Sequence, residues 1–285
     1  NQMYYKRGQI AIFILIGVLI LVVAGLFLFA KKRPASEESA EVVTGEAKIV
    51  NEYLKRCLTT KAEQAVLYNM KRGGYYKLPE VYALSPFITD STIPIAYPYY
   101  IYAYKLPPAV TPMSLDLAQD YLMDNVKDNF PSCLDSEMFS DRGIKIKAGE
   151  GNYSVVIGNK AVFFDVKIPI EILDSEGNII GTINSLHSEV EANVKRLITA
   201  ANAYINIQKD DTYSILMTDL IGVTSSEGII PGAMYIGNNE VVFTFVDPQT
   251  KINDEYLELN FAVKYTQREA SKDDLTGLYP ETDEA

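Results

Sequence analysis

The sequence predicts an α+β protein in which a long N-terminal hydrophobic helix precedes a helical, tyrosine-rich segment and a β-rich half, an antiparallel sheet or a sandwich. Three observations carry this prediction. Residues 10–30 contain no charged side chain, residues 47–72 repeat apolar side chains at helical spacing, and from residue 144 the apolar period shortens to two. A chain of 285 residues allows one large domain or two small ones.

Charge is divided unevenly between the N-terminus and the rest of the chain. Residues 1–33 hold five basic side chains and no acid, so the other 252 residues carry −16 against a total of −11. Nucleic acid and anionic membrane surfaces repel so acidic a body, and we expect no nucleic-acid partner. One His, two Cys and no Trp leave little material for a metal site or a His-based triad. We therefore expect no cofactor and no enzymatic activity.

The first expected element is a hydrophobic helix over Ile10–Ala30, within the basic-flanked segment 1–33. Its 21 residues would span roughly 30 Å, the hydrocarbon thickness of a bilayer, either in a membrane or in a filament core. Gly17 and Gly25 lie near one face and allow close helix contact, and Phe13 belongs to the same apolar run. An acidic, small-residue linker is expected to follow at 34–46.

Residues 6–13, Lys-Arg-Gly-Gln-Ile-Ala-Ile-Phe, with the apolar run behind them, resemble the class III signal of archaeal type IV pilin-like proteins. The resemblance covers about 25 residues and implies cleavage between Gly8 and Gln9 and use of the helix in a filament. Two features depart from the family. Pilins usually continue into an amphipathic stem where this chain has Pro34 and an acidic linker, and the fifth mature position is Phe13, where bacterial pilins have Glu. The whole-chain layout also resembles single-pass surface proteins of small-genome archaea.

Residues 47–135 are expected to hold two helices separated by a tyrosine-rich segment. The first helix runs over 47–72, where a Gly pair stops it. The second runs over 112–129, with Thr111 as its cap and Pro112 at its first position.

The intervening residues 75–104 contain eight tyrosines, and residues 93–106 are expected to form a strand. Pro94 and Pro98 are expected to place this strand at a sheet edge or in a loop. Three uses of the rings stay open: ordinary cross-strand packing, a contact surface for a partner, and a carbohydrate platform.

Residues 136–267 are expected to form a β-rich domain with one inserted helix at about 195–208, and residues 268–285 an acidic tail. Asp174–Asn178 is expected to be a hairpin turn, because it lacks the spacing and the closing Glu of a calcium loop. Strands with one buried face are expected at 162–172, 186–194 and 257–265.

Cys57 and Cys133 are the only thiols, and in an exported body they predict one disulfide. It would close a loop of 76 residues and contribute on the order of 4 kcal/mol in the chain-entropy treatment. Two buried free thiols are the alternative. Asn152 begins an Asn-Tyr-Ser sequon and is a candidate N-glycosylation site. His187 falls on the polar face of an expected strand, where a surface role is favoured over catalysis.

These features predict a non-enzymatic extracellular surface protein, foremost a pilin-like filament subunit that assembles through its N-terminal helix and supports adhesion or surface contact. The alternative is a single-pass, membrane-anchored binding or receptor protein, and a membrane-anchored hydrolase ranks below both. Expected partners are the membrane, copies of the chain, and other cells or surface proteins. The acidic body, the disulfide and the sequon favour a cell-surface location with the body outside, whereas the basic residues at 31–33 favour the opposite orientation.

Overall fold

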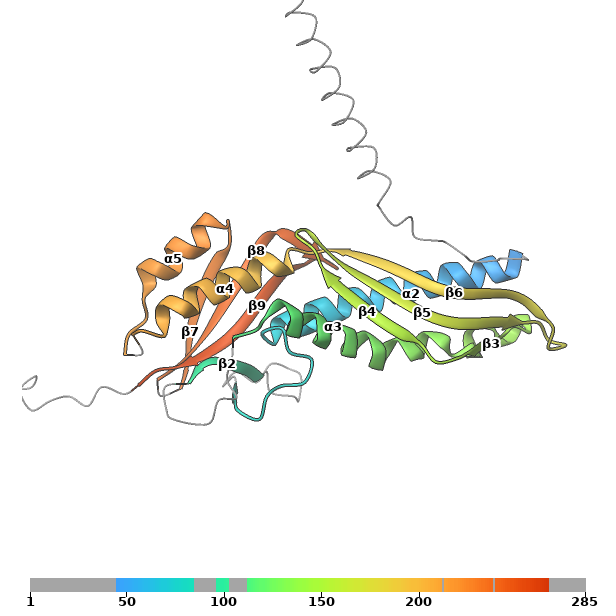
Figure 1. Ribbon diagram of the computed structural model, residues 1–285, viewed down its shortest axis with the longest axis horizontal. Helices are drawn as coiled ribbons and strands as arrows, with labels where there is room; N and C mark the ends of the chain where they lie inside the picture. The colour runs from blue at the N-terminus through green and yellow to red at the C-terminus, as the bar shows by residue number, and fades with distance from the viewer. Residues whose placement is uncertain (1–44, 85–95, 103–111, 212, 238, 267–285) are drawn as a thin grey trace, which may run out of the picture. The chain divides into compact units, whose positions relative to one another are not determined.

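The computed structural model describes residues 45–84, 96–102, 112–211, 213–237 and 239–266 (Figure 1). The helices of these residues are α2 (Gly45–Lys71), α3 (Leu115–Asn129), α4 (Val194–Gln208) and α5 (Met217–Ser226), with the short 3₁₀ turns η1 (Phe130–Leu134) and η2 (Ser136–Arg142). The strands are β1 (Tyr82–Leu84), β2 (Ala96–Tyr102), β3 (Lys145–Ala148), β4 (Asn152–Ile157), β5 (Ala161–Leu173), β6 (Ile179–Glu191), β7 (Ile230–Gly237), β8 (Glu240–Ile252) and β9 (Glu255–Lys264).

The strands form two sheets. The first has the order β1-β2-β9-β8-β7, in which β2 and β9 are parallel and all other neighbours are antiparallel. The second is antiparallel and is built on the long hairpin of β5 and β6. Because β6 pairs with β5 along most of its length, β3 and β4 share the other edge of β5.

Helices cover both sheets. α2 packs on β6 and reaches β9, and α3 lies beside α2 and against β4. α4 and α5 contact each other, α4 also contacts β8 and β9, and α5 contacts β7 (Figure 1). One continuous cluster of buried apolar side chains runs through both sheets and all four described helices. α2 therefore links the two sheets through a shared core.

The burial of α2 follows its sequence period. Its buried side chains recur every three or four residues, which places them on one face of the helix. That face approaches β6 so closely that a Cβ on Gly181 would lie 2.6 Å from the Cβ of Ala47. After the helix, Gly73 takes a positive φ of 62°, and a Cβ there would lie 2.5 Å from the Pro98 ring. Glycine is thus required at both close approaches.

Buried and exposed side chains alternate along the β5–β6 hairpin as the sequence predicts. In β5 the predicted apolar face is buried throughout, at Val162, Phe164, Val166, Ile168, Ile170 and Ile172. In β6, Leu186, Ser188 and Val190 are buried, while His187 between them is exposed. The prediction of strands with one buried face is confirmed here.

The predicted fold class is wrong in its first element. The long N-terminal hydrophobic helix is not among the elements that the structure describes: Ile10–Ala30 lies outside the described residues, and none of the helices in the described ranges is long and apolar enough to cross a bilayer. The tyrosine-rich segment and the β-rich half share a sheet, because β2 from the former pairs with β9 from the latter. The described residues form an α+β fold with four α-helices and nine strands.

Pro98 does not place its strand at an edge, since β2 lies between β1 and β9. Pairing between β2 and β9 begins at Tyr99, one residue after the proline, so the β2–β9 ladder needs no N–H from Pro98, which lies opposite Tyr82 of β1. Pro94 lies outside the described residues.

Two helix predictions are corrected in detail. The helix expected from residue 112 begins at Leu115, because the Ser114 hydroxyl accepts a hydrogen bond from the N–H of Leu117 at 3.1 Å and caps it. Pro112 precedes the helix and Thr111 lies outside the described residues. α5 was not predicted, because its period is weak: Leu220 and Thr224 are its only buried side chains.

Candidate functional site

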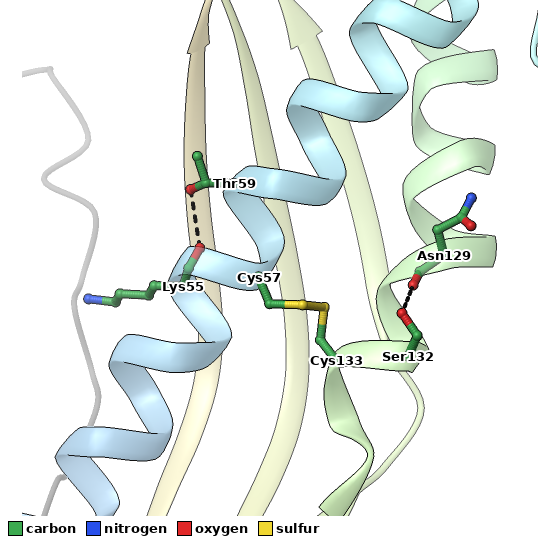
Figure 2. The surroundings of a disulfide bond; sticks show 6 residues. All are labelled: Lys55, Cys57, Thr59, Asn129, Ser132 and Cys133. Atoms are coloured by element: carbon green, nitrogen blue, oxygen red, sulfur yellow. Dashed lines mark hydrogen bonds between the residues drawn. A yellow bond between two sulfur atoms is a disulfide. The ribbon is translucent and has the colours of Figure 1, made fainter. Parts of the chain in front are cut away.

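The predicted cysteine pair lies between α2 and the end of α3, beside the sheet that contains β5 and β6 (Figure 2). Cys57 on α2 and Cys133 in η1 form a disulfide with a Cα–Cα distance of 6.0 Å, and 76 positions separate them in the sequence. Cys133 is fully buried and Cys57 packs against the core. The bond ties the middle of α2 to the end of α3.

The other predicted site residues do not converge. Asn152, with Ser154 of its sequon, is exposed on β4. His187 is exposed on the outer face of β6, where its Nδ1 lies 2.9 Å from the Oδ1 of Asp165. The predicted cleavage and hydrophobic-helix residues lie outside the described residues, namely Gly8, Gln9, Ile10, Phe13, Gly17, Gly25 and Ala30.

The segment Asp174–Asn178 is the turn between β5 and β6, as predicted. The Asp174 carboxylate accepts hydrogen bonds from the N–H of Glu176 at 2.9 Å and of Asn178 at 2.8 Å. Hydrogen bonds from the Asn178 side chain and backbone hold the pKa of Asp174 below its ordinary value. The carboxylate thus serves to close the turn.

A groove of about 700 Å³ lies where the β5–β6 hairpin meets α4 and β8. Three basic and two acidic side chains line it, together with amides and a hydroxyl. The charged side chains are Lys160, Glu189, Glu191, Arg196 and Lys251. Such mixed charge suits contact with a polar surface better than capture of a simple anion or cation.

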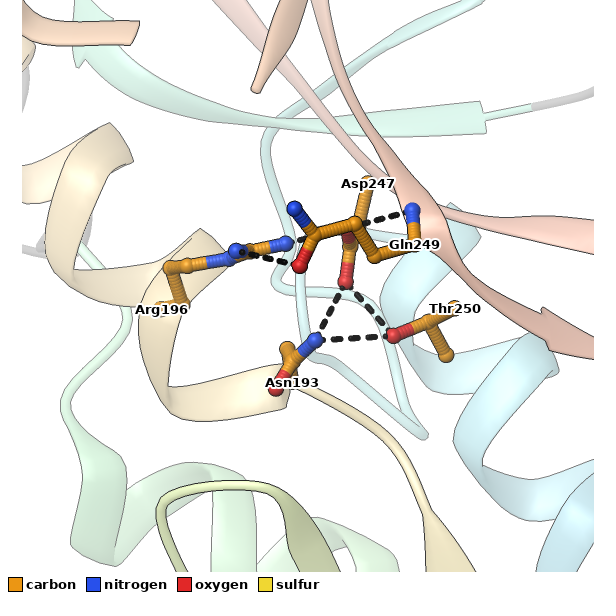
Figure 3. Close-up of polar contacts among 5 residues, drawn as sticks. All are labelled: Asn193, Arg196, Asp247, Gln249 and Thr250. Atoms are coloured by element: carbon orange, nitrogen blue, oxygen red, sulfur yellow. Dashed lines mark hydrogen bonds and ion pairs between the residues drawn. The ribbon is translucent and has the colours of Figure 1, made fainter. Parts of the chain in front are cut away.

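A buried carboxylate organises one wall of this groove (Figure 3). Asp247 on β8 has no exposed surface, and its Oδ2 accepts hydrogen bonds from Thr250 at 2.5 Å and from Asn193 at 2.8 Å. Its Oδ1 accepts the N–H of Gln249 at 3.0 Å and pairs with the guanidinium of Arg196. Asn193 and Arg196 stand at the start of α4, so the network fixes α4 on β8.

These contacts decide the charge state of Asp247. Burial raises its pKa, but hydrogen bonds from Thr250, Asn193 and the Gln249 N–H, together with the charge of Arg196, lower the pKa below its ordinary value. A carboxylate held in its charged form suits a structural anchor more than proton transfer. Within the described ranges, His, Cys, Asp and Glu side chains form no group of three or more that could hold a metal ion.

The sequence analysis did not single out Asp247, because a polar residue in a strand usually lies on the exposed face. One local signal was present: Asp247 is followed by Pro248, and the pairing of β8 with β9 shifts register between Asp247 and Lys251. A proline inside an alternating strand marks such a bulge. The partners Asn193 and Arg196 lie more than fifty residues away in the sequence, and nothing local identifies them.

Replacing Asp247 with Asn is expected to lower the free energy of unfolding by about 3 kcal/mol at pH 7, because Arg196 loses its charge partner and the donors lose an acceptor. Since the folded-state pKa of Asp247 is lowered, its stabilisation is complete above its ordinary pKa and is lost as the pH falls through the folded value. Urea unfolding at pH 7, 5 and 3 measures both effects.

The matched control is Asp165→Asn, which removes a carboxylate that also contacts a nitrogen-bearing side chain, the His187 ring, but is 46% exposed. It should change the free energy of unfolding by less than about 1 kcal/mol. A pH-independent difference between Asp247→Asn and the unaltered protein would contradict the assignment.

Comparisons of the chain with protein families, with characterised proteins and with solved structures return no match. The likeness of residues 6–30 to pilin-like signals therefore stays a prediction from sequence.

Proposed function

We propose that the chain is an exported, non-enzymatic surface protein whose folded body makes contacts outside the cell. The observation that carries this proposal is the Cys57–Cys133 disulfide, because such bonds persist in oxidising compartments and are rare in reducing ones. The apolar run Ile10–Ala30, between basic flanks, supplies the segment that would hold the body at the surface.

Of the two uses of that apolar run, we favour a pilin-like filament subunit. The class III-like residues 6–13 support it, and so does α2, an amphipathic helix that packs along an antiparallel sheet. α2 begins 15 residues after Ala30, and the acidic linker lies between the two, where a pilin has its stem. Pro34 and the acidic residues after it favour the second candidate, a membrane-anchored binding protein.

Location is tested on intact cells that produce the full chain. Protease added outside the cells should remove the body. A thiol reagent applied to the denatured protein should label both cysteines only after reduction, because Cys133 is fully buried in the folded body. The matched control is a Cys57→Ser, Cys133→Ser double variant, which should take no label in either state. A body protected from protease until the cells are lysed, with both thiols free, would overturn the proposal.

Mass spectrometry of the mature N-terminus then separates the two candidates. A start at Gln9, together with fibres in electron micrographs of sheared surface material, supports the filament subunit. An uncut chain that remains in the membrane fraction, with no fibres, supports the anchored protein instead.

A further inference from the structure

A second pocket, of about 350 Å³, lies between α2 and α3 and is separate from the groove at Asp247. Helical spacing sets its walls, since side chains three, four or seven residues apart lie on one face of a helix. α2 contributes residues 61, 64 and 68, α3 contributes residues 125 and 129, and the segment after α2 contributes residue 76. The lining side chains are Lys61, Gln64, Tyr68, Tyr76, Asn125 and Asn129.

The two tyrosine rings contact each other and nearby cationic side chains without any ligand. Tyr68 is 44% exposed, yet the guanidinium of Arg72 lies 4.7 Å from its ring centroid. The Tyr76 ring stands edge-on to it, with centroids 6.2 Å apart, and carries Lys77 at 5.5 Å. Cation–π contacts of this kind favour this orientation of the rings. A ligand that stacks on them therefore loses little to ordering of the protein.

A chain of amides continues from the pocket into the core. The Nδ2 of Asn129 donates to the Oδ1 of Asn125 at 2.9 Å, and the Nδ2 of Asn125 donates to the Oδ1 of Asn69 at 2.8 Å. Asn69 is fully buried, and its Nδ2 has no partner within the part of the chain that the structure describes. Because each amide orients the next, the polar groups at the pocket wall are held in place.

We propose that this pocket binds a neutral sugar ring. A sugar presents a C–H face that packs on tyrosine and hydroxyl groups that both donate to and accept from amides, which matches the lining of aromatic rings and carboxamides. Lys61 is the one charged side chain among the lining residues, and residues 34–285 carry −16, so a phosphorylated ligand is disfavoured. The inference extends the proposed surface contact by naming carbohydrate as what the body contacts, but it does not depend on a filament.

The test is saturation-transfer NMR on the full chain, solubilised in a polyoxyethylene detergent because alkyl glycosides would compete for the pocket. The probes are the methyl glycosides of glucose, galactose, mannose and N-acetylglucosamine. At least one should bind, and Tyr68→Ala should weaken its affinity about tenfold through loss of the stacking face. Asn129→Ala should weaken it similarly through loss of hydrogen bonds to the hydroxyls.

The matched control is Tyr256→Ala, because Tyr256 on β9 is 47% exposed and also carries a lysine over its ring, at 4.5 Å, but does not line this pocket. The affinity of the Tyr256→Ala variant for the sugar should be unchanged. Thermal unfolding of all three variants checks that they fold. Absence of binding to every probe, or binding that Tyr68→Ala leaves intact, would overturn the proposal. The two proposals are tested separately. If no sugar binds in vitro, the proposed surface location is unaffected, and if the protein is found inside the cell, the sugar-binding result is unaffected.

Discussion

Raising the pH from 9 to 11 is expected to lower the free energy of unfolding by about 5 kcal/mol, which is a large part of the stability of an ordinary domain. Four buried tyrosines are responsible, and they are Tyr75, Tyr100, Tyr204 and Tyr265, each at most 5% exposed. Burial raises the pKa of Tyr75 and of Tyr204 to about 12. Burial likewise raises the pKa of Tyr100 and of Tyr265 far above the ordinary value.

The sign follows from proton binding in the two states. Above pH 10 the unfolded chain releases these phenolic protons, while the folded protein keeps them, so the folded state binds more protons and stability falls as the pH rises. Between pH 9 and pH 11 each phenol contributes about 1.4 kcal/mol in total, because the unfolded chain ionises half-way through this range. The loss ends for each tyrosine when the pH passes its folded-state pKa.

Urea unfolding at pH 7, 9, 10 and 11 measures this loss, and absorbance at the tyrosinate band shows whether ionisation accompanies unfolding. Tyr100→Phe should reduce the loss by about a quarter, although it removes the hydrogen bond from the Tyr100 hydroxyl to the Gly73 carbonyl, 2.9 Å long. Tyr256→Phe, at a half-exposed ring, is the control and should leave the loss unchanged. Stability that is constant up to pH 11 would refute the prediction.

Replacing Gln208 with Leu is expected to lower the free energy of unfolding by about 5 kcal/mol, because five polar groups meet at this fully buried amide. Its Oε1 accepts the hydroxyls of Tyr204 at 2.6 Å and Tyr265 at 3.2 Å, and the N–H of Leu216 at 3.2 Å. Its Nε2 donates to the carbonyls of Ser214, at 2.8 Å, and of Asp211. Leucine would leave the buried hydroxyls of Tyr204 and Tyr265 without this acceptor, and the Leu216 N–H and the two carbonyls, which are only partly buried, would also lose their partner.

Urea unfolding at pH 7 measures the cost, and hydrogen exchange of the segment between α4 and α5 shows whether the loss is local. Asn206→Ala is the control, since Asn206 lies on the same helix but is exposed, and it should cost less than about 0.5 kcal/mol. A loss of less than about 1 kcal/mol in Gln208→Leu would show that the network adds little stability.

The candidate sites were almost invisible in the sequence. Polar residues such as Asp247, Gln208 and Asn125 also occur at solvent-exposed positions, so their residue types alone do not mark a site. Each is identified by partners from distant segments: Asn193 for Asp247, Tyr265 for Gln208 and Asn69 for Asn125. The cysteines are the exception, because a chain with two thiols allows a single pairing.

The sequence by itself determined the local elements: the buried face of β5, most of α2 and α4, and the turn at Asp174–Asn178. It did so because the face on which a side chain lies follows from backbone geometry within a few residues. The tertiary structure alone decided that β2 pairs with β9 and that α2 and α3 enclose a pocket. Those outcomes depend on which distant segments meet in a shared core, and hydrophobic burial, which has no direction, does not encode the choice in any local pattern.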